Sequence, residues 1–226
     1  MSVVFGALML SLTACATPGA TIAGGPANEQ IAAFDARVES GEAIVAEIGA
    51  MSARDRLLRE AIIDGFRTTT TGEERQAYIE GTRHHFDRID GETTARLRQI
   101  FARMSWRELN AISPAAAEQT FSLISHSDDT EFKREMAAQF EPLARDGTIR
   151  GEQYANLIDD IALSENRGQV YGMNFECHHG VYQAKPVEDP ANLNARRASI
   201  HLNSIEDYSA QMRIMYSECP ADYSGN

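Results

Sequence analysis

The chain has 226 residues, of which 43% are hydrophobic and 24% are charged, a composition typical of a globular domain. Its formal net charge of −12 argues against nucleic-acid binding, because phosphates would be repelled, and against a polybasic contact with membrane lipids. No apolar run reaches about 18 residues, so no helix is expected to remain in a membrane as a span.

The first apolar segment runs from Val3 to Leu12, a length typical of signal peptides rather than of membrane spans. It ends in Leu12-Thr13-Ala14-Cys15, which resembles the lipobox of bacterial lipoproteins. The resemblance implies cleavage before Cys15 and attachment of a diacylglycerol to its thiol. Because Ala16 rather than Asp follows, it also implies the outer membrane, with the protein facing the periplasm. The alternative is an ordinary secretory signal in which Cys15 occurs by chance.

These features divide the chain into three regions. Residues 1–14 are predicted to be a lipoprotein signal peptide. Residues 15–28 carry no charged side chain and are rich in Gly, Pro, Ala and Thr, which predicts a flexible tether. Residues 29–226 are predicted to form one helical domain.

Apolar side chains recur at helical spacing from residue 29 to about residue 165. The clearest case is Leu97, Ile100, Phe101 and Met104, which match the positions i, i+3, i+4 and i+7. Helices of this kind, joined by short loops, are expected to pack around a single core.

A few residues predict where these helices begin and end. Ser40-Gly41 and Gly91 are expected to interrupt helices, because glycine is unfavourable in a helix interior. Ser52 is predicted to cap a helix, and residues 68–72 are predicted to form a loop. Pro142 is expected to kink or end its helix, since proline lacks a backbone N–H.

The pattern changes in the last third of the chain. From Gln169, β-branched and aromatic residues predict a β-hairpin with His179-Gly180 at its turn. Ser204 is expected to cap the last helix, which should bury a stripe formed by Ile205, Tyr208, Met212 and Met215. The predicted fold class is therefore mainly α: a single-domain helical bundle with one small β-hairpin near the C-terminal third.

Several short pieces of sequence, taken in order, resemble an uncharacterised bacterial family, a domain of unknown function, over about residues 87–208. Its pattern runs H-x-x-D, D, Q-x-Y-G, D-P and R-R. The resemblance implies a domain type and no activity. The matching pieces are Asp90, Thr94-Ala95-Arg96-Leu97, Trp106, His126, Asp129, Phe132, Asp159, Arg167-Gly168-Gln169-Val170-Tyr171-Gly172, Pro186, Asp189-Pro190 and Arg196-Arg197.

The polar members of this pattern are the candidate site. The hypothesis is that they converge near the base of the hairpin, where His126 acts as acid or base, a carboxylate orients it and an Arg holds an anion. The alternative is a structural network of satisfied hydrogen bonds, in which Asp159 is simply solvated. The catalytic candidates are His126, Asp129, Arg196 and Arg197, and the binding candidates are Asp159, Gln169 and Tyr171.

Metal and cofactor sites are not expected. In Cys177-His178-His179 and in His84-His85, adjacent side chains point in different directions, so they do not suit one metal ion. No glycine-rich phosphate loop occurs outside the tether. With Cys15 lipidated, Cys177 and Cys219 remain, and an oxidising compartment favours a disulfide between them.

Two functions remain open from the sequence. The first is an envelope lipoprotein, anchored to the membrane by lipid, whose helical domain binds an envelope protein or a small molecule. The second is a periplasmic acid–base or hydrolytic enzyme that uses His126 with Asp129 and with Arg196 or Arg197. The enzyme requires His126 and an Arg within a few ångströms of each other, lining an open cleft.

Overall fold

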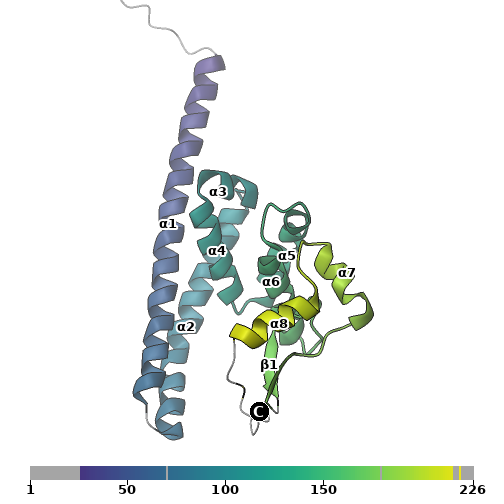
Figure 1. The fold of residues 1–226 in the computed structure, drawn as a ribbon. Coiled ribbons are helices and arrows are strands. Elements are labelled where there is room, and N and C mark those ends of the chain that lie inside the picture. Colours follow the sequence, from purple (N-terminus) through teal and green to yellow (C-terminus); the bar gives the residue numbers. More distant parts are fainter. Residues whose placement is uncertain (1–25, 70, 179, 216–218, 220–226) are drawn as a thin grey trace, which may run out of the picture. The chain divides into compact units, whose positions relative to one another are not determined.

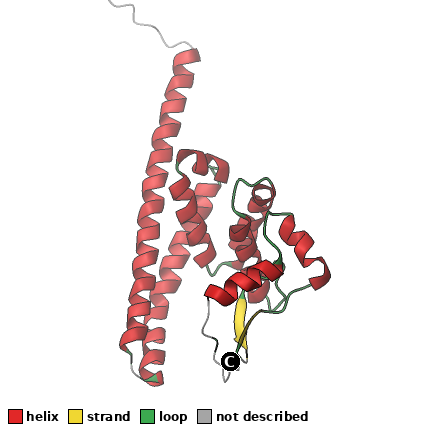
Figure 2. Ribbon diagram, viewed as in Figure 1, coloured by secondary structure: helices red, strands yellow, loops and turns green. Residues whose placement is uncertain are grey.

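A computed structural model describes residues 26–69, 71–178, 180–215 and 219 of the chain. Within these residues it contains eight α-helices, one short 3-10 helix and one two-stranded antiparallel hairpin (Figures 1 and 2). The predicted fold class, mainly α with one small hairpin in the C-terminal region, is confirmed. The described residues divide after Ser40 into two compact units, and everything described below as a site lies within the second.

The first two helices are longer than the glycine pattern predicted. Helix α1 spans Pro26–Thr68 and helix α2 spans Gly72–Phe101. Both run without interruption, so the expected breaks at Ser40-Gly41 and Gly91 are wrong, and Ser52 lies inside α1 rather than at a cap. A single glycine costs only about 1 kcal/mol in a helix interior, which the packing of its neighbours readily offsets.

Four shorter helices follow, and the first three begin at a polar residue whose side chain caps the helix. Helix α3 (Trp106–Ile112) is capped by Ser105, α4 (Pro114–His126) by Ser113 and α5 (Thr130–Arg145) by Asp129, whose side chains accept backbone N–H bonds. Helix α6 spans Gly151–Ser164. Pro142 lies inside α5, which continues to Arg145, and Gly147 follows the helix with a φ of 76°.

The core lies among these helices. The Trp106 indole is buried and packs edge-on against Phe140, with ring centroids 4.7 Å apart. Leu97 and Ile100 are buried as their spacing predicted, while Phe101 and Met104 pack at the margin of the core. In the ranges that the structure describes, no helix combines the length and the apolar character that crossing a membrane requires.

The hairpin is shorter than predicted. Strand β1 (Phe175–His178) pairs with β2 (Val181–Ala184), and Cys177 lies opposite Tyr182. Residues 169–174, expected in the first strand, form a loop instead, apart from a single bridge between Gln169 and Val187. A buried carboxylate captures the backbone N–H groups of this loop, as described below, so they are not available for a strand.

The chain ends with the 3-10 helix η1 (Pro190–Asn192) and helices α7 (Leu193–Ala198) and α8 (Ile205–Met215). Ser204 caps α8 as predicted, since its hydroxyl accepts the Asp207 N–H at 3.1 Å. The predicted stripe is only partly buried: Ile205, Tyr208 and Met212 are partly exposed, and Met215 is 65% exposed. Tyr208 of α8 packs against Phe175 of the hairpin.

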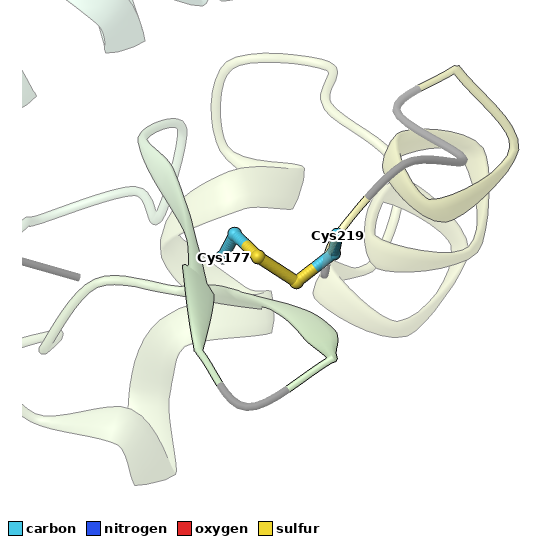
Figure 3. Close-up of a disulfide and its surroundings, with 2 residues drawn as sticks. All are labelled: Cys177 and Cys219. Atoms are coloured by element: carbon cyan, nitrogen blue, oxygen red, sulfur yellow. A yellow bond between two sulfur atoms is a disulfide. The ribbon is translucent and has the colours of Figure 1, made fainter. Parts of the chain in front are cut away.

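The predicted disulfide is confirmed. Cys177 of β1 is bonded to Cys219, with their Cα atoms 5.4 Å apart (Figure 3). The bond joins the chain beyond α8 to the hairpin and closes a loop across a sequence separation of 42.

Replacement of Gly151 by Ala should destabilise the fold by at least about 2 kcal/mol. A Cβ at Gly151 would lie 1.9 Å from the backbone carbonyl oxygen of Ile200, which cannot rotate away. The matched control is Gly81→Ala in α2, where a Cβ meets nothing within 4 Å, and it should stabilise by about 0.5–1 kcal/mol. Urea unfolding midpoints measure both, and equal midpoints would contradict the close packing of α6 on this carbonyl.

Replacement of both Cys177 and Cys219 by Ala should lower the free energy of unfolding by about 2–4 kcal/mol, because the cross-link restricts the unfolded chain. Denaturant unfolding of the double variant and of the wild type, with and without reductant, measures the loss. Reductant should destabilise the wild type and leave the double variant unchanged; equal stabilities would show that the bond contributes nothing.

Candidate functional site

The polar residues that the sequence singled out fall into two separate groups in the structure. Asp159, Gln169, Tyr171, Arg196 and Arg197 form one network around residues 169–174. The described hydrogen bonds of this network do not include His126, whose partners are on α1. The expected single pocket at the hairpin base is therefore not formed.

Asp159 is fully buried and holds the loop that follows α6. Its Oδ1 accepts the backbone N–H of Val170 at 2.7 Å and of Tyr171 at 2.8 Å, and its Oδ2 accepts that of Met173 at 2.7 Å. The interpretation of Asp159 as a solvated residue is wrong, because the loop covers the helix face on which it lies. Burial raises the pKa of Asp159, and the three N–H donors oppose that shift.

Gln169 closes the base of the same loop. Its side-chain amide donates to the carbonyl oxygens of Asn174 and Lys185, both at 3.0 Å, and its oxygen accepts the Asn174 N–H at 2.6 Å. Gln169 is also fully buried, and these three bonds engage both its amide nitrogen and its amide oxygen with the backbone. Such bonds support the structural alternative for this residue.

The two adjacent arginines bind backbone carbonyls. Arg196 donates to the carbonyl oxygens of Val170, Asp189 and Glu188. Arg197 is fully buried and donates to the carbonyl oxygen of Tyr171 at 2.6 Å and to that of Asn203 at 2.7 Å, and burial lowers its pKa. Both guanidinium groups are thus occupied by the fold itself.

Asp129 also has a structural position. Its carboxylate accepts the Phe132 N–H at 2.9 Å and pairs with Arg98 at 3.0 Å; these contacts lower its pKa. Asp129 does not share a helix face with His126, because α4 ends at His126 and Asp129 caps the next helix.

His126 is oriented instead by α1, from far away in the sequence. Its Nδ1 lies 2.9 Å from Asp55 Oδ2 and 2.9 Å from Arg59 Nε. The same Arg59 Nε–H lies 2.9 Å from Asp55 Oδ1, and it can donate to the ring only when Nδ1 carries no proton. The Asp55 side chain is 8% exposed and that of His126 is 36% exposed, which places a buried anion behind a partly open imidazole.

This arrangement decides what the imidazole can do. When Nδ1 carries a proton it donates to Asp55, and Nε2 then presents a lone pair. In the described part of the chain, no group forms a hydrogen bond with Nε2. A carboxylate that holds one ring nitrogen while the other stays available is the geometry of a general base.

Asp90 of α2 is a second carboxylate beside Asp55, Arg59 and His126, and the four residues are called here the His126 cluster. Asp90 is poorly paired. Its side chain is 11% exposed, it makes no hydrogen bond with the described residues, and its ion pair with Arg59 Nη2 is long, at 3.9 Å. The same Nη2 atom is buried without a hydrogen-bond partner. Burial raises the pKa of Asp90, and Asp128 and Asp55 add to the shift while Arg59 opposes it.

The pKa of Asp55 is shifted in the opposite direction. Burial would raise it, but the hydrogen bond and charge of His126 and the charge of Arg59 outweigh burial and lower it.

Arg59, Asp90, His126 and Asp128 line a pocket of about 350 Å³, named here the His126 groove. Its volume is within the range of small-molecule sites. A second pocket, of about 390 Å³, shares Asp87, Asp90 and Asp128 with it. The groove is lined by Arg59, Ile62, Phe66, Ile79, Thr82, Arg83, Phe86, Asp87, Asp90, His126 and Asp128.

Sequence reasoning found His126 but missed its partners Asp55 and Arg59. The four-residue spacing of Asp55 and Arg59 indicates an ion pair on one helix face, which is common and therefore carries little information. Asp90 was present in the family pattern, yet without a motif that linked it to His126. Within the described residues, no group of three or more His, Cys, Asp or Glu side chains is placed to hold one metal ion.

Comparison with known protein families places residues 44–218 in DUF6624, a family of unknown function. The match covers most of the chain, and the protein therefore belongs to this family. No curated protein and no solved structure matches the chain.

The two carboxylates of the cluster should respond to pH in opposite ways. Because the folded state holds the Asp90 proton more tightly, the stability that it contributes is present below about pH 4 and is lost as the pH rises through the folded pKa. Asp90→Asn should therefore stabilise the protein at pH 7, by about 0.5–2 kcal/mol, and progressively less towards pH 4.

Asp55→Asn is the matched comparison. The lowered pKa of Asp55 means that its stabilisation is present above about pH 4 and is lost in acid, so this variant should be destabilised at pH 7. Urea unfolding of both variants at pH 4 and pH 7 measures the difference. Loss of stability in Asp90→Asn at pH 7 would show that the Asp90 carboxylate is well paired after all.

Proposed function

We propose that this protein is a lipoprotein of the bacterial cell envelope whose helical domain binds a small ligand in the His126 groove. The observation that carries ligand binding is the unoccupied Nε2 of His126, whose ring is held by Asp55 beside the poorly paired Asp90. The His126 side chain is 36% exposed, so a ligand can reach this nitrogen, and Arg59 Nη2 in the same groove is buried without a hydrogen-bond partner.

The proposed location is supported by the sequence. Leu12-Thr13-Ala14-Cys15 has the character of a lipobox, and residues 16–28 have the composition of a tether. Both segments lie outside the described residues, apart from the start of α1 at Pro26. Acyl chains on Cys15 would hold the domain at the outer membrane, on the periplasmic side, where an envelope protein is a further candidate partner.

Acid–base catalysis in the same groove is the second candidate function. It is favoured by the opposite pKa shifts of Asp55 and Asp90, because paired groups whose environments separate their pKa values are typical of acid–base sites. In this scheme His126 Nε2 takes a proton from the substrate or from an attacking water, and Asp90 supplies one. Arg59, rather than Arg196 or Arg197, is the guanidinium beside His126, at 2.9 Å.

The test is a thermal-stability screen of the full chain against sugars, peptidoglycan fragments, nucleotides, anions and metal ions. A ligand that binds only the folded state raises the free energy of unfolding by about 2.7 kcal/mol at one hundred times its Kd. We expect a compound that raises the Tm of the wild type and fails to raise that of His126→Ala.

His84→Ala is the control, because His84 is an exposed histidine on α2 that does not line the groove. It should retain the wild-type shift. If no compound acts, and His126→Ala only lowers the Tm, His126 is part of the scaffold and the proposed function is wrong. Conversion of a bound compound by the wild type, with loss in Asp90→Asn, would favour catalysis over binding alone.

A further inference from the structure

The His126 groove has an apolar wall and a charged end. On α1, Ile62 and Phe66 follow Arg59 at helical spacing, and on α2, Ile79 and Phe86 face the same pocket. Phe66 is 37% exposed, and the other three are partly exposed. The wall therefore offers apolar surface, left accessible between the two helices, to the body of a ligand.

The charged end is acidic. Asp87, Asp90 and Asp128 line both neighbouring pockets, and neither Asp87 nor Asp128 has a hydrogen bond or ion pair in the described part of the chain. Arg59 Nε is engaged by Asp55 and the His126 ring, and its Nη2 lies 3.9 Å from Asp90. Arg83 also lines the groove and has no ion pair with the described residues, so three carboxylates share the groove lining with two guanidinium groups.

We infer that the ligand of the His126 groove is an amphipathic amine, with its ammonium group at Asp87, Asp90 and Asp128 and its apolar body between α1 and α2. This inference rests on the proposed function. An ammonium group is a compact charge with three donors, which suits carboxylates approaching from different directions. An anion of the same shape would be repelled by the three carboxylates.

The net charge of the chain also favours a cationic ligand. A value of −12 attracts cations over distances of about one Debye length and disfavours anions. Within the fold, the partly buried Asp90 has only a long ion pair, 3.9 Å from Arg59 Nη2. A bound ammonium group would give it a closer one and so stabilise its charged form.

Three probes of equal chain length isolate the headgroup: octylamine, octanoate and 1-octanol, each titrated into the full-length protein by calorimetry at pH 7 and low salt. Octylamine should bind at least about tenfold more tightly than octanol, and octanoate more weakly than octanol, and added salt should reduce the preference. Phe66→Ala should weaken octylamine and octanol to the same degree, because it removes apolar wall and no charge.

Charge variants assign the preference to this end of the groove. Asp128→Asn should reduce octylamine affinity several-fold, and the double variant Asp90→Asn with Asp128→Asn should abolish its advantage over octanol. The control is Asp64→Asn, since Asp64 is an exposed α1 carboxylate outside the groove, paired with Arg67 at 3.5 Å. It should bind octylamine as the wild type does. Urea unfolding confirms that each variant is folded.

The outcomes separate this inference from the proposed function. Equal binding of the three probes, a preference for octanoate, or an amine preference that survives in the double variant would overturn the amine ligand and leave the groove as a site. If none of the probes binds but another compound does so in a His126-dependent manner, the amine inference again fails alone. If nothing binds in either experiment, both fail.

Discussion

The C-terminal third of this protein depends on one buried carboxylate. Asp159 accepts three backbone N–H groups from residues 170–173, a segment that would otherwise place unpaired donors inside the protein. Gly172 has a φ of 71°, in the left-handed region that favours glycine, and this allows its neighbours to turn their N–H groups towards one acceptor. Arg196 and Arg197 then bind the carbonyl oxygens of Val170 and Tyr171, so the fold engages both donors and acceptors of this loop.

The contrast between this network and the His126 cluster distinguishes scaffold from candidate site. Around Asp159, Gln169 and Arg197 each polar group is matched, and the side chains are fully buried. Around His126 the matching is incomplete, because Nε2, the Asp90 carboxylate and Arg59 Nη2 have no hydrogen-bond partner among the described residues. Arg59 Nη2 is buried and the His126 side chain is 36% exposed, so a ligand that enters the pocket can reach and complete these groups.

Local sequence features predicted elements well and partners poorly. Periodicity located the helices, and Ser204 was identified as a cap because capping depends on residues within one turn. The expected helix breaks at Gly41 and Gly91 did not occur. Glycine costs about 1 kcal/mol in a helix interior, and the free energy gained from packing a long helix is larger. Asp129 was assigned to His126 because it is near in sequence, whereas the true partner, Asp55, is separated from His126 by 71 positions.

The sequence by itself determined the mainly helical class, the family and the pairing of Cys177 with Cys219, since these follow from periodicity, residue order and the small number of cysteines. Only the tertiary structure decided which polar residues meet. Asp159 is buried because a loop folds over its helix face, and His126 faces a groove because α1 brings Asp55 and Arg59 to the end of α4. Helical spacing specifies the faces of one helix, but the partner of each face depends on long-range packing that no local pattern encodes.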